Sequence, residues 1–283
     1  MTDRKSTSMG AGFPWLFMGL TFGLSWPIMI AYILSGTTAQ GATPALTIAC
    51  SAPSLVGILL TYFTSDRAGW ADFWKRVVSF KLIGLKWFAV IICLYPCLLV
   101  LGLLADKLFG GAFPPLGGAQ QMLLHPAALL LIVGRGMMIG GPLSEELGWR
   151  GFALDRLQNR WNALTASLLL GIVWAVWHLP LFYIKGNDHT AMSFWLFSLY
   201  VVSLSVLMTW VYNNTQRSIL SAILMHFMVN ETYTFMAPDG PPLASSAFAA
   251  VTVMIVIAAL VVVGRWGFKT LTLRSSAGRV SAA

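Results

Sequence analysis

Residues 13–34 read FPWLFMGLTFGLSWPIMIAYIL, an apolar run without a single charged side chain. The surrounding stretch from Ser6 to Ser65 also contains no Asp, Glu, Lys, Arg or His. It is long enough for two membrane spans of about 20 residues each, joined by a short turn near Ser35–Gly41. Because the first run begins too late and is too long for a cleaved signal peptide, we expect a retained anchor.

The composition extends this interpretation to the whole chain. Of its 283 residues, 57% are hydrophobic and 10% are charged, and the mean hydropathy is +0.75. Soluble domains carry roughly 25% charged residues, so we predict an all-α, multi-pass integral membrane protein. We expect it to reside in a bacterial cytoplasmic membrane. About eight transmembrane helices are predicted, at 13–34, 44–64, 86–105, 126–143, 162–183, 192–212, 218–236 and 246–264.

Most basic residues fall on one predicted side of the membrane. With a cytoplasmic N-terminus, 15 of the 18 Lys and Arg residues are cytoplasmic, whereas Lys107 and Lys185 lie outside and Arg135 lies within a span. This asymmetry follows the positive-inside rule and predicts that both termini are cytoplasmic. The net charge of +8 then reflects topology and contact with the lipid bilayer, so we expect no nucleic-acid partner.

The chain shows no internal division, and we predict one integral membrane domain over residues 1–283. The charged connection 66–86 is either an amphipathic helix on the cytoplasmic surface or a solvated basic loop. The basic, serine-rich tail after Arg265 is expected to be disordered. The three cysteines fall inside predicted spans and are expected to pack there rather than to form a disulfide framework or a metal site.

Ionisable and strongly polar side chains inside the spans are rare, and such groups usually face the interior of a helix bundle and serve a function. They are Arg135, Glu145, Glu146, His178, His226, Asn230 and Glu231. Residues 140–150, GGPLSEELGWR, can simply begin a helix at Pro142, with an ion pair between Glu146 and Arg150 four residues apart. Glu145 is rotated by about 100° from Glu146, and the structural interpretation leaves it unexplained.

The remaining polar groups can come together at a similar depth. His226 and Asn230 are one helical turn apart and point the same way. Glu145 and His178 lie roughly 21 and 28 Å from a turn near Asn159 in an antiparallel hairpin. This requires the fourth helix to continue past the Gly140–Pro142 kink to around Arg156. Each group also has a structural explanation, such as an interhelical hydrogen bond.

Three short motifs on separate apolar segments resemble those of the CAAX-protease and bacteriocin-processing family of intramembrane endopeptidases, which includes the type II CAAX prenyl proteases. Glu145, Glu146 and Arg150 match its Glu-Glu-x-x-x-Arg motif, and His226 and Asn230 match its His-x-x-x-Asn motif. His178 matches Phe-x-x-x-His with Trp174 in place of the Phe. The resemblance covers residues 134–232, which we take as the catalytic core.

The resemblance implies an intramembrane endopeptidase. The chain has no Ser or Cys in a recognisable nucleophile motif and no His-Glu-x-x-His helix, which favours water as the nucleophile. By the resemblance, Glu145 is the general base and His178 orients the water. Glu146 and Arg150 support the helix, and His226 and Asn230 stabilise the oxyanion. The implied substrate is a membrane-embedded or lipidated protein, reached from the cytoplasmic half.

Two other functions use the same residues. Glu145, His178 and His226 could instead bind Zn²⁺ with one position open for water. We favour no cofactor, because the sequence shows no carboxylate placed to orient either histidine. A proton or small-solute transporter could use the same polar cluster with Arg135, although the sequence has no inverted repeat. An inactive scaffold is a further possibility, against which the intact motifs count.

Overall fold

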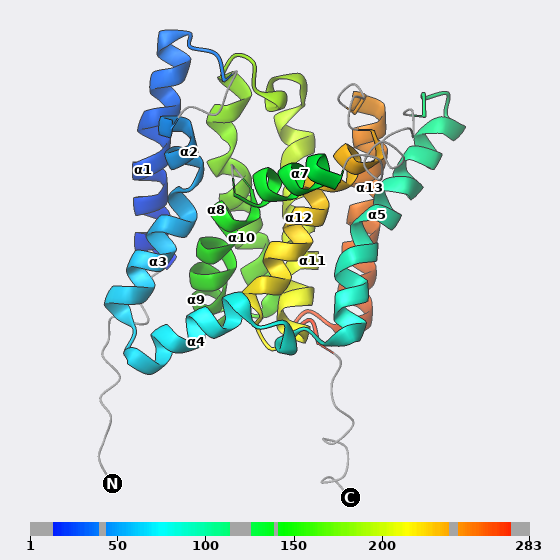
Figure 1. Cartoon of the computed structure of the whole chain (residues 1–283). Coiled ribbons are helices and arrows are strands. Elements are labelled where there is room, and N and C mark those ends of the chain that lie inside the picture. Colours follow the sequence, from blue (N-terminus) through cyan, green and yellow to red (C-terminus); the bar gives the residue numbers. More distant parts are fainter. Residues whose placement is uncertain (1–13, 40–43, 114–125, 139–140, 238–242, 273–283) are drawn as a thin grey trace, which may run out of the picture.

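The computed structural model describes residues 14–39, 44–113, 126–138, 141–237 and 243–272, and these residues form helices and connecting turns without any strand. Most of the helices run roughly parallel to one another as a bundle, and both ends of the chain leave it at the same end (Figure 1). The all-α prediction is therefore confirmed for the described residues.

Five elements are long and apolar enough to cross a membrane. They are α1 (Pro14–Ser35), α5 (Gly84–Leu108), α10 (Ala163–Trp177) extended by the 3-10 turn η4 (Leu179–Tyr183), α11 (Phe194–Asn214) and α13 (Ser245–Trp266). The pair α2 (Pro44–Cys50) and α3 (Ala52–Thr64) is apolar enough as well but is bent by 58°, the geometry of a broken span or of a re-entrant loop. The chain is therefore a multi-pass membrane protein, whereas the predicted total of about eight spans is not confirmed.

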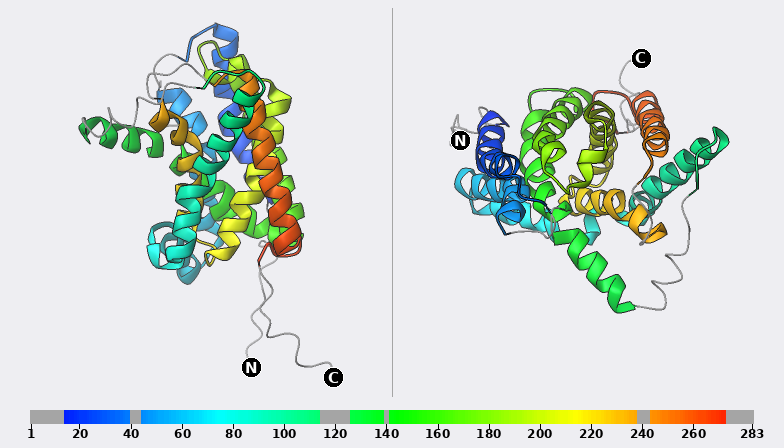
Figure 2. Two further views of the ribbon diagram at one scale, coloured as in Figure 1. Left: turned by 90° about the vertical axis from the view of Figure 1, so that its right-hand side faces the viewer. Right: turned by 90° about the horizontal axis from the view of Figure 1, so that it is seen from above.

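Two of the predicted spans differ from the others. α7 (Pro126–Met138) has 13 residues, about 20 Å of helix, which is shorter than the roughly 30 Å hydrocarbon core. It lies across the bundle in Figure 1 and projects away from it in Figure 2. α12 (Ile219–Met236) follows the bundle but carries the polar residues His226, Asn230 and Glu231, which lower its hydropathy.

The segment that carries the two adjacent glutamates is one continuous helical run with a distorted middle. α8 (Pro142–Gly148) passes directly into the π-helical η3 (Trp149–Leu154) and then into α9 (Asp155–Gln158). The predicted continuation to about Arg156 is therefore confirmed. The prediction was wrong in making this run the extension of the fourth helix, since α7 is a separate element lying across the bundle. The π-helical turn, a feature common at functional sites, was not predicted.

Two glycines fix the distance between α8 and α3. A Cβ atom on Gly57 of α3 would lie 2.6 Å from the Cα atom of Gly148. A Cβ atom on Gly148 would lie 2.1 Å from the carbonyl oxygen of Pro53. Because glycine has no Cβ, the two backbones can touch, as small residues allow in membrane helix packing. This contact sets the depth and rotation of the helix that carries the glutamates.

The helical alternative for 66–86 is confirmed for residues 67–78, and the rest of this stretch is a short turn and the start of α5. Asp66 caps α4 (Arg67–Val78) by accepting a hydrogen bond from the Gly69 amide at 2.8 Å. A short 3-10 turn, η2 (Phe80–Leu82), follows. α4 buries Phe73 and Val77 and lies at the end of the bundle that carries both termini (Figure 1).

The segment after α13 is ordered as far as the described residues reach, so the expectation of disorder directly after Arg265 was wrong. The carbonyl oxygens of Phe268 and Lys269 accept from the Leu164 and Ala163 amides at 3.1 and 2.9 Å. They satisfy two amide donors that the start of α10 would otherwise leave unpaired. The side-chain amides of Asn213 and Asn214, at the end of α11, donate to the carbonyls of Thr270 and Leu271 at 2.9 and 2.7 Å. Residues 273–283 lie outside the described part.

Candidate active site

Glu146 is the centre of a buried charge cluster. Its two carboxylate oxygens accept from Arg150 Nη1 at 2.8 and 3.0 Å, and Oε1 also lies 2.8 Å from His226 Nδ1. Glu146 and Arg150 are fully buried and His226 is 5% exposed. The predicted ion pair between Glu146 and Arg150 is therefore confirmed. The link to His226 on α12 joins the first and third sequence motifs.

Glu145 points to a different partner. Its Oε2 atom accepts a hydrogen bond of 2.6 Å from the indole nitrogen of Trp174 on α10. Among the described residues, this is the only side-chain hydrogen bond to Glu145, and it leaves the Oε1 atom without one. The two adjacent carboxylates thus have separate roles: Glu146 is occupied by cations, whereas Glu145 keeps one oxygen available.

Trp174, which stands in place of the Phe of the second motif, connects all three motifs. Besides its bond to Glu145, its carbonyl oxygen lies 2.8 Å from His178 Nδ1. Its ring stands 5.3 Å from the His226 ring and 4.5 Å from the Arg150 guanidinium carbon. The Nε and Nη2 atoms of Arg150 have no hydrogen-bond acceptor in the described part. The cation–π contact with the Trp174 ring stabilises the guanidinium group instead. A Phe could supply the ring but not the N–H donor.

Both motif histidines are fixed in one tautomer by their partners. A backbone carbonyl can only accept, so His178 carries its proton on Nδ1, donates to Trp174 and leaves Nε2 as an acceptor. Likewise, a carboxylate only accepts, so His226 Nδ1 donates to Glu146. His226 Nε2 then acts as a donor only when the ring carries both protons.

These residues share a cavity of about 130 Å³. A water molecule occupies roughly 30 Å³ in the liquid, so the cavity has room for several waters. The lining contains all four residues predicted to be catalytic: Glu145, His178, His226 and Asn230. The other lining residues are Trp174, His189, Phe197, Tyr200, Val201, Leu204 and Val229. Asn230 is exposed, whereas the two motif histidines are buried. Arg135 and Glu231, also singled out in the sequence, do not belong to this lining.

His189 is a site residue that the sequence reasoning missed. It belongs to the 3-10 turn η5 (Asp188–Ala191), and its ring stacks on His178 with centroids 5.6 Å apart and planes 29° apart. Its Nδ1 donates to Asn187 Oδ1 at 2.8 Å. Burial lowers its pKa to about 4, against a smaller opposing effect of Asp188, so the ring is neutral near pH 7. A lone histidine in a loop gives no periodic signal from which this position could be inferred.

The cavity lies away from the end of the bundle that holds the termini. The end of α11 is hydrogen-bonded to residues 270 and 271 near the C-terminus, whereas the cavity is lined by Phe197–Leu204 in the first half of that helix. The sequence predicted cytoplasmic termini and also access from the cytoplasmic half. On α12, however, the lining residue His226 lies near the middle of the helix, so access from the cytoplasmic half stays a prediction.

Zn²⁺ bound by Glu145, His178 and His226 is the alternative that the sequence leaves open. One premise against zinc was wrong, because Glu146 is a carboxylate that orients His226. The ligand types are suitable as well. Among the described residues, however, no three His, Cys, Asp or Glu side chains are grouped closely enough to hold a metal ion. The arrangement of the described side chains therefore does not fit Glu145, His178 and His226 as a set of zinc ligands.

Comparisons with known proteins agree with the motif pattern. The family model described as type II CAAX prenyl endopeptidase Rce1-like matches residues 126–232, which contain all three motifs. The chain is also 30% identical over 196 residues to CAAX prenyl protease 2 of Methanococcus maripaludis, a match that covers 66% of this chain and 70% of that protein. The chain therefore belongs to the CAAX protease family of membrane endopeptidases.

Proposed function

We propose that this protein hydrolyses a membrane-proximal peptide bond by means of a water molecule that Glu145 activates. The observation that carries the proposal is the division of labour between the two adjacent glutamates. Glu146 is held by Arg150 and His226, whereas Glu145 lines the cavity with one carboxylate oxygen unpaired. A general base needs such an oxygen within reach of its water.

In the first step, the water proton passes to Glu145 Oε1 while the water oxygen attacks the peptide carbonyl carbon. His178 Nε2, which is an acceptor when Nδ1 donates to Trp174, accepts the second water proton in a hydrogen bond and orients the attack. Trp174 holds the other oxygen of Glu145 and so fixes the direction of the carboxylate. In the second step, the proton on Glu145 passes to the leaving amine as the C–N bond breaks.

The oxyanion is stabilised by donors on α12. The Asn230 side-chain amide supplies one hydrogen bond, and His226 Nε2 supplies another when the ring is doubly protonated. Removing one oxyanion donor typically costs about 10²–10³ in rate.

The family favours a lipidated substrate, and a prenylated CAAX protein is the class that we propose. The relative from Methanococcus maripaludis carries this activity in its name. The apolar bundle around the cavity is consistent with a substrate that arrives through the lipid phase. The transporter hypothesis gains no support from the described residues, because Arg135 and Glu231 do not line the cavity.

The test uses the purified full-length chain in lipid nanodiscs. Cleavage of a prenylated CAAX peptide, its unprenylated form and a panel of transmembrane peptides is followed by mass spectrometry. We expect Glu145→Gln to reduce cleavage by roughly 10³-fold or more at unchanged thermal stability. Glu231→Gln, a half-buried glutamate outside the cavity lining, serves as the matched control and should retain activity.

A zinc chelator is added to each variant in parallel. Activity that survives the chelator supports the glutamate-activated water, whereas loss that only zinc restores would make Glu145, His178 and His226 ligands. Full activity in Glu145→Gln would refute the proposed site.

A further inference from the structure

A second polar cavity lies at the end of the bundle that carries both termini. It measures about 300 Å³ and is bounded by the end of α3, by α4, by α9 and by the turn before α12. Figure 1 shows α4 and α9 side by side at this end. The residues that line it are Thr61, Ser65, Gly69, Asp72, Phe73, Arg76, Gly151, Asp155, Arg156, Asn159 and Arg217. None of them belongs to the active-site cavity.

The charges around this cavity do not balance. It contains three guanidinium groups and two carboxylates, so it carries one excess positive charge. Asp155 is shared: its Oδ2 accepts from Arg76 Nη1 at 3.0 Å, its Oδ1 accepts from Arg217 Nε at 2.9 Å, and the Tyr212 hydroxyl donates to it at 2.8 Å. Asp72 Oδ2 lies 3.0 Å from Arg76 Nε. Both carboxylates are therefore occupied by Arg76 and Arg217.

Arg156 is the cation that remains. In the part of the chain that the structure describes, it forms no ion pair with a carboxylate. It donates to the carbonyl of Phe152 at 3.0 Å and to Thr64 Oγ1 at 3.4 Å, and it stacks on the Phe152 ring. Burial lowers the pKa of Arg156 to about 10, which Asp155 offsets only in part. A partly buried cation without a counter-charge is stabilised by any anion that enters the cavity.

The surroundings of the cavity indicate the depth at which it lies. Tyr62 and Phe63, beside the lining residue Thr61, are 60% and 73% exposed, and the Tyr62 ring packs 5.5 Å from Trp70 on α4. Exposed aromatic rings beside basic groups are typical of the headgroup level of a membrane. Aromatic and basic side chains at this level fit a lipid that carries an anionic headgroup.

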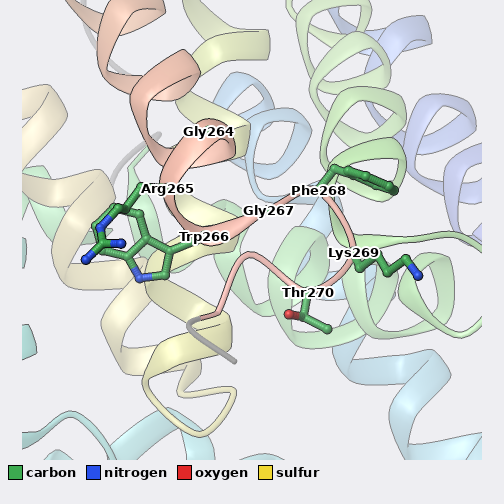
Figure 3. Close-up of a pocket in the computed structure, with 7 residues that line it drawn as sticks. All are labelled: Gly264, Arg265, Trp266, Gly267, Phe268, Lys269 and Thr270. Atoms are coloured by element: carbon green, nitrogen blue, oxygen red, sulfur yellow. The ribbon is translucent and has the colours of Figure 1, made fainter. Parts of the chain in front are cut away.

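A second space, beside the loop after α13, also contains basic side chains but holds them differently. The loop after α13 borders a space of about 330 Å³ that is lined by residues 264–270, including two basic side chains. Figure 3 shows that Arg265 and Lys269 project to opposite sides of this loop. Two cations that diverge cannot hold one anion together, so the basic cavity between α4 and α9 is the better site.

We propose that the cavity lined by Arg76, Arg156 and Arg217 binds a phosphate group, and that an anionic phospholipid headgroup supplies it. A guanidinium fork pairs well with phosphate oxygens, and the Ser65 hydroxyl and the Asn159 amide line the same cavity as additional donors. A soluble phosphate offers the same chemistry without the acyl chains that would contact Tyr62 and Phe63. This site is independent of the proposed hydrolysis.

The experiment measures retained lipid on the detergent-purified full-length protein by native mass spectrometry, with phosphatidylglycerol and phosphatidylcholine offered in equal amounts. A second arm measures the thermal unfolding midpoint in inorganic phosphate and in chloride at equal ionic strength. The variants are Arg156→Gln and Asn159→Asp, and Lys75→Gln is the control. Lys75 lies on the exposed face of α4 outside the cavity lining, so its substitution removes the same charge from the same region.

We expect the wild type and Lys75→Gln to retain phosphatidylglycerol selectively, because Lys75 lies outside the cavity. Arg156→Gln should retain about fivefold less, because it removes a direct charge contact with the headgroup phosphate. Asn159→Asp places a negative charge at an exposed position of the lining and should reduce retention even if Arg156→Gln folds poorly. Phosphate stabilisation that depends on Arg156, without lipid selectivity, would support the anion site but assign it a soluble ligand. Equal retention in all variants, without a phosphate effect, would overturn the proposal.

Discussion

The two ends of one helical run, from Pro142 to Gln158, lie in clusters with opposite excess charge. Its first turns lie inside the bundle, where there are two carboxylates and one arginine, and its last turn lies at the end of the bundle, where arginines outnumber carboxylates. Among the described residues, each cluster leaves one charged group without an ion pair: Glu145 in the interior and Arg156 at the end. In both places the paired groups hold the structure, and the unpaired group is the one available to a ligand.

The two clusters also differ in burial: Arg150 is fully buried, whereas the Arg217 side chain is 57% exposed. The substitution with the largest expected effect on stability is therefore in the buried cluster. Arg150→Met would leave the Glu146 carboxylate fully buried with only His226 as a partner. Removing one member of a buried ion pair costs about 3–5 kcal/mol, so we expect a strongly lowered unfolding midpoint or no folded protein. Thermal unfolding in detergent measures it.

The matched control is Arg217→Gln at the other cluster, where the arginine side chain is 57% exposed. Exposed ion pairs contribute about 0–1 kcal/mol, so this variant should unfold close to the wild type. Similar losses of stability in both variants would contradict the distinction between the clusters.

Trp174→Phe tests the contact that orients the unpaired carboxylate. The variant keeps the aromatic ring but removes the N–H that donates to Glu145 Oε2. Hydrogen bonds to charged groups contribute about 1.5–3 kcal/mol, so we expect kcat for peptide cleavage to fall roughly 10- to 100-fold with little change in KM. Steady-state kinetics with the wild type and this variant measure both values, and an unchanged kcat would show that the indole donor has no part in catalysis.

The smallest expected effect concerns His189 and pH. Its pKa in the folded protein is about 4, below the roughly 6.5 of an unfolded chain. Protonation therefore favours unfolding: the stability is fully present above about pH 6.5 and is lost as the pH falls toward 4. His189→Phe keeps a ring against His178 but cannot be protonated. When the pH is lowered from 7 to 4.5, the unfolding midpoint of this variant should therefore fall less than that of the wild type.

Unfolding midpoints at pH 7 and pH 4.5 give this comparison, with an expected difference of a few degrees. Asp188 opposes the shift, and Asp188→Asn should enlarge the wild-type pH effect slightly. Identical pH dependence in the wild type and His189→Phe would show that this histidine does not titrate as described.

Part of the site could be predicted from the sequence because it depends on local spacing. The ion pair between Glu146 and Arg150 follows from residues four apart on a helix. The shared cavity of His226 and Asn230 follows from the same periodicity. His226 and Glu146, which are in contact, are 80 residues apart in the sequence, and no local pattern indicates this contact. His189 and the indole donor of Trp174 were missed for the same reason.

The sequence by itself determined that this chain is a helical membrane protein of the CAAX protease family, because apolar run length, charge and motif spacing are local properties of the chain. The tertiary structure decided which polar groups are paired. The close approach of Gly57 and Gly148 sets the rotation of α8, and that rotation directs Glu146 toward His226 and Glu145 toward Trp174. Such partners depend on the depth and rotation of packed helices, which a single sequence does not record.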